Sequence, residues 1–210
     1  MRSKDACRAV NVLFHHVYIQ EVILKKRAVL TVFVLGFMVV GSAAFGHDLV
    51  WPGQKLKALF PQAESFEQKN LYVTDEQRAN IEKALGVKLP DEDLKPSIYL
   101  AVVRSTPDAP LRKAGAIMFI DAQGGGGKIE MGVVVSGKGD LAKVLIFENK
   151  ESAKLIDPAF LKQFEGKKAS DLFKAGNDIK APAGMDKAAQ AIASGARRGL
   201  FIINEMFRKK

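Results

Sequence analysis

The amino-acid sequence predicts an α+β fold, in which an antiparallel sheet of about four to six strands carries helices on its face and ends and a long C-terminal helix. The first observation behind this prediction is a series of four short runs, rich in Ile, Val, Phe and Tyr, between positions 97 and 148. The second is the short Pro- or Gly-bearing turns between these runs, because a parallel pair would need a much longer crossover. The third is an amphipathic helical pattern near the C-terminus.

Two helices are predicted ahead of the strands. Segment 53–60 places its apolar side chains on one helical face before Pro61 ends the pattern, so a short helix is expected there. Thr74 has the hydroxyl of an N-cap residue and is followed three residues later by Gln77, which makes a capping-box sequence. A helix is therefore predicted to run from Thr74 to Gly86, where a glycine can end it.

Four strands are predicted in the middle of the chain: Ser97–Arg104, Ala114–Asp121, Lys128–Val135 and Leu141–Glu148. The second and third are joined through the glycine run Gly124–Gly127. This run does not fit a phosphate loop of the P-loop or Rossmann type, because no Lys-Ser/Thr pair follows it and the next element is a strand. We interpret it as a flexible hairpin connection.

Two more helices are predicted after the strands. Asp157 and Pro158 supply an N-cap and a first-turn proline for a helix that closes at Gly166. The terminal helix, from about 187 to 208, has apolar side chains at three- and four-residue spacing. Such a helix should pack across one face of the sheet.

The N-terminal residues 1–46 are predicted to be an extension that contains a signal peptide or signal anchor, which leaves 47–210 as a single domain. An apolar run over 28–45 follows a basic triplet at 25–27, and small residues near its end suit cleavage close to Phe45 or His47. An uncleaved anchor is the alternative, and it would give the protein a membrane contact through this segment. The domain is expected to be periplasmic or otherwise extracytoplasmic.

The net charge of +9 does not indicate a nucleic-acid partner. Residues 1–46 hold six of the 32 basic and two of the 23 acidic side chains, so 47–210 is left with 26 and 21. The lysines of this domain are scattered among acids instead of forming a stripe, which is typical of a solvated surface.

A metal site or a hydrolase site is not predicted. The only cysteine is Cys7, and the adjacent His15 and His16 would point in different directions on any regular element. The domain has no Ser-His-Asp set. Two acid pairs are interpreted as surface charge: Asp91/Asp93 and Glu148/Glu151.

The block 176–200, which joins a turn-rich lead to the terminal helix, carries a motif. Without gaps it matches the signature of the FMN-binding domain family at six positions: Asp178, Ile179, Gly184, Ala191, Ile192 and Arg197. The chain thus resembles the periplasmic flavin subunits of the Rnf electron-transport complex and of the sodium-translocating NADH:quinone reductase. The glycine turn with Lys128 and the segment 157–166 also resemble that family, so the likeness covers most of the chain from Trp51 to Phe207.

The motif departs from the family where the flavin is attached. The family's Ser is Ala183, its Ala is Met185 and its flavin-carrying Thr is Asp186. A carboxylate cannot form the stable phosphoester that a Thr hydroxyl makes with the FMN phosphate, so no covalent attachment is expected. The resemblance then implies FMN held noncovalently. Considered by itself, Asp186 is also well suited to be the N-cap of the terminal helix.

The resemblance implies a cofactor site of eight residues: Glu151, Ser152, Lys180, Ala183, Gly184, Met185, Asp186 and Lys187. Glu151 and Ser152 match a His-x-Glu-Thr element of the family, and the rest lie around the start of the terminal helix, where free amides suit a phosphate. The implied function is an electron carrier that serves a redox partner protein or a membrane electron-transport complex. The alternative is a flavin-free binding or assembly module descended from the same family.

Overall fold

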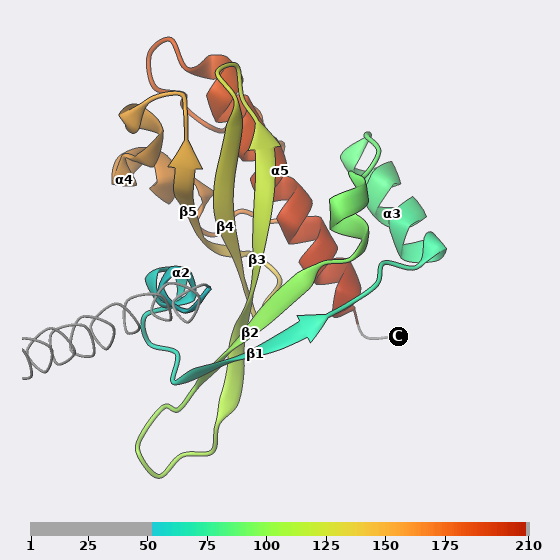
Figure 1. Cartoon of the computed structure of the whole chain (residues 1–210), viewed down its shortest axis with the longest axis vertical. Helices are drawn as coiled ribbons and strands as arrows, with labels where there is room; N and C mark the ends of the chain where they lie inside the picture. Colours follow the sequence, from blue (N-terminus) through green and yellow to red (C-terminus); the bar gives the residue numbers. More distant parts are fainter. Residues whose placement is uncertain (1–51, 209–210) are drawn as a thin grey trace, which may run out of the picture. The chain divides into compact units, whose positions relative to one another are not determined.

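Residues 52–208 are described by a computed structural model (Figure 1), and the structural statements below concern that part of the chain. The predicted signal segment, Cys7, His15, His16 and Trp51 lie outside the described residues. From Pro52 onward the chain forms one compact unit with its own core. Within residues 52–208, no helix is both long enough and apolar enough to cross a bilayer.

The sheet has five antiparallel strands, arranged in the order in which they occur in the chain. They are β1 (Ser65–Asn70), β2 (Ser97–Val103), β3 (Arg112–Gln123), β4 (Lys128–Ser136) and β5 (Leu141–Asn149). The predicted α+β class, with its antiparallel sheet and long C-terminal helix, is confirmed, and β2–β5 correspond to the four predicted strands. The short connections between β2 and β5 favour pairing of strands that are consecutive in the chain, whereas β1 joins β2 across a longer connection that contains α3.

Strand β1 is an element that the sequence did not indicate. Its residues, SFEQKN, include one apolar side chain, and most of them are exposed at the edge of the sheet. The strand forms because β2 offers it a free row of backbone groups, with Phe66 opposite Ala101. An edge strand that buries so little has almost no alternation of apolar and polar residues to reveal it.

The helices are α2 (Gly53–Leu59), α3 (Asp75–Leu85), α4 (Pro158–Leu161) and α5 (Asp186–Met206), and short 3-10 turns occupy Asp91–Leu94, Ala153–Ile156 and Lys162–Phe164. The predicted capping box is confirmed: Thr74 Oγ1 accepts from the Gln77 amide and Gln77 Oε1 accepts from the Thr74 amide, at 3.3 and 3.0 Å. Gly86 ends α3 with φ of 75°, a conformation that favours glycine.

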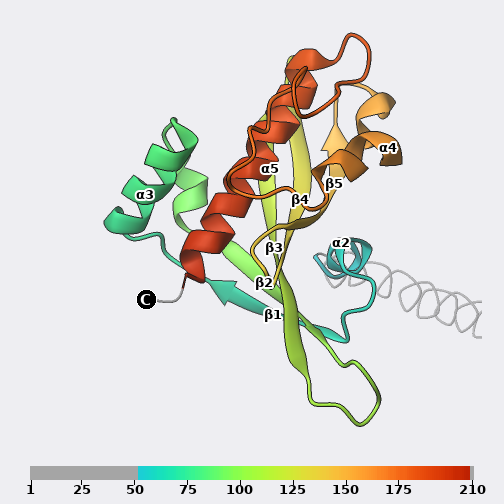
Figure 2. The ribbon, with the colours of Figure 1, turned by 180° about the vertical axis from the view of Figure 1, so that it is seen from behind.

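Helix α5 covers one face of the sheet, as predicted, and crosses β3 and β4 (Figure 2). Its buried side chains include Ile192, Leu200 and Ile203, each at most 2% exposed. The helix lies close to the strands because it carries glycine where they meet: a Cβ on Gly199 would be 3.3 Å from three carbons of Val133. This close approach sets how near α5 lies to β4.

The opposite face of the sheet is partly covered by α2. Leu56, Leu59 and Phe60 pack there in a second apolar cluster with Ile117 and Val134. The two sides of the sheet therefore have separate cores, one under α5 and one under α2.

The interpretation of the pair Asp91/Asp93 as surface charge is wrong for Asp93. This side chain is 4% exposed, and its Oδ2 lies 2.7 Å from Nε of Arg198 on α5. The 3-10 turn after α3 folds the carboxylate inward, whereas Asp91 stays exposed. The sequence did not indicate this contact because the partners are more than a hundred positions apart.

Candidate functional site

Three segments that resemble the flavin-binding family in sequence meet near the tip of the β3–β4 hairpin. They are the glycine turn 124–127, the loop that follows β5 and the start of α5, which lies beside the hairpin tip in Figure 1. A Cβ built on Gly125 would lie 3.5 Å from Cδ of Lys187 and 3.9 Å from both carboxylate oxygens of Glu151. Glu151 and Lys187 are therefore brought together, although 36 positions separate them.

The glycine turn holds a carboxylate. Gly126 donates its amide hydrogen to Glu151 Oε1 at 2.5 Å, and Gly124 donates to the Gly127 carbonyl at 2.9 Å to close the turn. A Cβ on Gly124 would overlap Glu151 Oε1, and a Cβ on Gly126 would lie 3.3 Å from the carboxyl carbon. The glycines thus leave the space that the carboxylate fills, and we call the turn with this space the glycine cradle. The prediction of a hairpin connection is correct, and the cradle adds a contact to it.

The loop that presents Glu151 is held by Asn149. Its Oδ1 accepts from the amides of Glu151 and Ser152, both at 3.1 Å. The Ser152 hydroxyl accepts from the Lys154 amide at 3.2 Å and so caps the next 3-10 turn. Asn149 was not among the predicted site residues, although an Asn at the end of a strand is a common signal for such a turn.

The start of α5 differs from the expectation. The N-cap residue is Met185, which has no side-chain capping bond, and Asp186 is the first helical residue. The reason is a tight turn: the Met185 amide donates to the Pro182 carbonyl at 2.9 Å, with Gly184 at φ of 76°. The expectation that Asp186 is the N-cap is wrong, and the first amides of α5 have no side-chain partner in the described part of the chain.

The remaining predicted residues, Lys180 and Ala183, lie on the segment that leads into α5. The backbone of Lys180 is pinned to the turn after α4 by Gln163, whose Oε1 accepts from the Lys180 amide at 2.7 Å and whose Nε2 donates to its carbonyl at 3.1 Å. Ala183 is exposed beside Gly184. These two residues shape the entry to the helix, and neither donates a side-chain group to the cradle.

Asp178, one of the matched motif positions, organises the same segment. Its carboxylate accepts from Nζ of Lys167 at 2.8 Å and from the amides of Phe173 and Lys174 at 3.0 and 2.7 Å. Burial acts to raise the pKa of Asp178, but these hydrogen bonds outweigh it and lower the pKa to about 2. The motif Asp is thus explained as the anchor of the loop, a role that the sequence alone did not assign.

The residues present fit the phosphate end of FMN in one respect and oppose it in another. The glycine cradle already accommodates an anionic group, the uncapped start of α5 supplies free amides, and Lys187 supplies a positive charge. The carboxylates of Glu151 and Asp186 compete for the same positive environment. No residue from Ala183 to Ala189 has a hydroxyl, so the motif holds no acceptor for a phosphoester.

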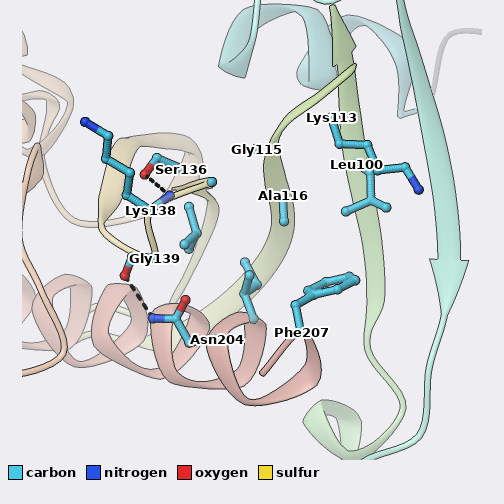
Figure 3. A pocket seen from close by; sticks show the side chains of 12 residues that line it. Leu100, Lys113, Gly115, Ala116, Ser136, Lys138, Gly139, Asn204 and Phe207 are labelled. Atoms are coloured by element: carbon cyan, nitrogen blue, oxygen red, sulfur yellow. Dashed lines mark hydrogen bonds between the residues drawn. The ribbon is translucent and has the colours of Figure 1, made fainter. Parts of the chain in front are cut away.

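A second feature, at the other end of α5, was not predicted. A pocket of about 420 Å³ opens between the last turn of the helix and the β4–β5 turn (Figure 3). Asn204 closes one side by donating from Nδ2 to the Gly139 carbonyl at 2.9 Å, and Phe207 lies at the end of the helix beside it. None of the eight predicted site residues lines this pocket.

No protein-family model matches the chain, and no curated protein matches it.

Proposed function

We propose that this protein is an exported FMN-binding protein that holds its flavin noncovalently and acts as an electron carrier in a membrane-associated redox system. The observation that carries the proposal is the glycine cradle, which already binds a carboxylate beside the uncapped start of a 21-residue helix. An oxyanion bound by a backbone amide next to a helix N-terminus is the arrangement that suits a phosphate.

The charges around the cradle argue for weak to moderate affinity. Lys187 and the positive end of the α5 dipole attract a phosphate. Asp186 opposes it by roughly 4 kcal/mol if the charges lie about 4 Å apart at an effective dielectric constant near 20. Because Lys187 follows Asp186 directly, it offsets part of this repulsion. A noncovalent and exchangeable cofactor agrees with this balance better than a permanent one.

The flavin ring would supply the electron-transfer chemistry when bound, and the protein would supply its orientation and surroundings. In this proposal the amides of Gly126 and of the first turn of α5 hold the phosphate, and Lys187 neutralises part of its charge. The partner is a redox protein or a membrane electron-transport complex on the outer side of the cytoplasmic membrane.

A second candidate function is a flavin-free binding or assembly module. The observation that favours it is the pocket at the far end of α5, together with Phe207, whose side chain is 44% exposed at the end of the helix. Single exposed hydrophobic side chains are common on protein surfaces, so it is the pocket that Phe207 lines that favours a binding role.

The test is a titration of residues 47–210 with FMN, followed by flavin fluorescence. Asp186→Thr and Asp186→Asn are measured alongside, the second of which removes the charge without adding a hydroxyl. Asp108→Asn, on the exposed β2–β3 loop, is the control for a general charge effect. Saturable quenching by the wild type, strengthened in both Asp186 variants and unchanged in the control, supports the flavin proposal. If the wild type and both variants fail to bind FMN, the binding module is favoured.

A further inference from the structure

We propose that the Glu151 carboxylate normally occupies the glycine cradle. A phosphate group then binds there only after this carboxylate has moved out. The inference deepens the proposed function, because it concerns the site to which FMN is assigned. It makes its own claim about phosphate, however, which can be tested without flavin.

The shape of the cradle points to an anion and not merely to a tight turn. The hairpin needs glycine at position 127, where φ is 141°, but no such backbone requirement applies at Gly124 and Gly126. At those two positions the nearest atoms to an added Cβ include the carboxylate of Glu151. Positions 124 and 126 carry no side chain because the Glu151 carboxylate fills the space that a side chain would need.

Glu151 is delivered to the cradle by a fixed backbone. Asn149 binds the amides of both Glu151 and Ser152, so the loop holds the carboxylate close to the Gly126 amide. A group tethered in this way competes at a high effective concentration with any free anion. Its side chain is only half-buried, so it can rotate into water without disturbing the core.

Lys187 supplies a positive charge for the incoming phosphate. The stem of this side chain and the Glu151 carboxylate lie within 4 Å of the same point beside Gly125. When the carboxylate leaves, the positive charge and the amides of the first turn of α5 stay where they are. A phosphate in the cradle would then lie next to the Gly126 amide, the N-terminus of α5 and the ammonium group of Lys187.

The consequence is a competition that can be measured. The apparent dissociation constant equals the intrinsic constant divided by the fraction of molecules in which the cradle is open. If Glu151 occupies the cradle about nine-tenths of the time, its removal should tighten phosphate binding about tenfold. Glu151→Ala should show the full effect. Glu151→Gln should show part of it, because its amide oxygen still accepts from Gly126 but carries no charge.

The experiment measures binding of inorganic phosphate, and separately of FMN, to the full-length protein by equilibrium dialysis. The proteins are the wild type, Glu151→Ala, Glu151→Gln and the control Glu148→Gln, which removes an exposed carboxylate of β5. Thermal unfolding of each checks that it is folded. Tighter phosphate binding in the order Ala, Gln, wild type, with the control equal to the wild type, is the expected result.

The outcomes separate the two proposals. Equal phosphate affinity in all four proteins, or no phosphate binding by any of them, overturns the role of Glu151. If the variants gain phosphate binding and no protein binds FMN, Glu151 keeps its assigned role and the flavin proposal fails. If phosphate affinity is equal in all four proteins and all four bind FMN equally well, the flavin proposal stands and the internal competition is rejected.

Discussion

Nε of Arg198 on α5 lies 2.7 Å from Oδ2 of Asp93, with 17% and 5% of the two side chains exposed. Arg198 also donates from an Nη atom to the Asp121 carbonyl of β3 at 2.6 Å. The pair thus ties the turn after α3 to both the helix and the sheet. Within the described residues, neither Asp93 Oδ2 nor Arg198 Nε has a well-aligned hydrogen bond, so the attraction is mainly that between the two charges. A contact of this kind should make the free energy of unfolding depend on pH.

Replacing Arg198 by Met should destabilise the protein strongly near neutral pH, because Asp93 would remain as a buried charge without a partner. We expect a loss of about 3 kcal/mol in the free energy of unfolding, measured by urea denaturation at pH 7.5. The loss should be clearly smaller at pH 5, where Asp93 can take up a proton. Equal losses at both pH values would contradict this account.

In the wild type, the contribution of Asp93 to the free energy of unfolding should decrease as the pH rises from about 4 to about 6. Burial raises the pKa of Asp93 from 3.8 to about 6, helped by the charges of Glu92 and Asp121 and opposed by Arg198. A pKa that is higher in the folded than in the unfolded state gives a stabilisation that is complete below the unfolded pKa and is lost as the pH rises through the folded one.

The measurement for this pH effect is the difference in unfolding free energy between the wild type and Asp93→Asn, followed from pH 4 to pH 7.5. Over this range the wild type should lose about 3 kcal/mol of unfolding free energy relative to Asp93→Asn, since the variant cannot titrate at that position. Other carboxylates contribute equally to both proteins and cancel. A flat difference would show that Asp93 has an ordinary pKa.

Asp178→Asn should loosen the segment that leads into α5. The carboxylate accepts three hydrogen bonds there, and one of them holds the amide of Phe173, a buried residue with φ of 54°. We expect a loss of about 2 kcal/mol, because an amide cannot pair with Lys167 as a charge and offers only one acceptor atom. Limited proteolysis should cut the variant faster between 167 and 180, while Asp108→Asn, on the exposed β2–β3 loop, serves as the control.

The contribution of Asp178 to the free energy of unfolding depends on pH in the opposite direction from that of Asp93. Its pKa is lowered to about 2, so its stabilisation is present above the unfolded value of 3.8 and is lost as the pH falls through the folded one. Acid unfolding of Asp178→Asn should therefore be less steep than that of the wild type between pH 4 and pH 2. Identical acid transitions would contradict the assigned role.

Gly199→Leu should separate α5 from the sheet. A Cβ at this position already meets Val133 at 3.3 Å, so a larger side chain must displace the helix or the strand. We expect a loss of about 3 kcal/mol in thermal and urea unfolding. Ser194→Leu puts the same side chain on the exposed side of the same helix, where it removes only the exposed hydrogen bond from Gln190, and should cost much less stability.

Most of the fold could be predicted because its elements are encoded by neighbours in sequence. The alternation of β2–β5, the capping box at Thr74 and the apolar spacing of α5 each arise within one short segment and need no distant partner. Strand β1 could not be predicted in this way, since a single apolar residue in an edge strand gives no pattern. It pairs only because β2 lies beside it.

The candidate site was predictable as a set of segments but not as a set of contacts. The motif around Asp186 and the position of Glu151 were identified, whereas the role of Asn149 and the hydrogen bond from Gly126 to Glu151 were not. The N-cap was assigned to Asp186 because Asp is well suited to that place, but the turn at Gly184 moves it to Met185.

Nearby residues thus determine the local structure, because hydrophobic spacing, caps and turns depend on the conformations open to a few adjacent residues. Charged side chains are different, because whether a carboxylate is solvated, buried or bound to an amide depends on what the fold brings next to it. The sequence alone could therefore predict the sheet, the helices and the segments of the site. Only the tertiary structure decided that Asp93 is buried against Arg198 and that Glu151 fills the glycine cradle.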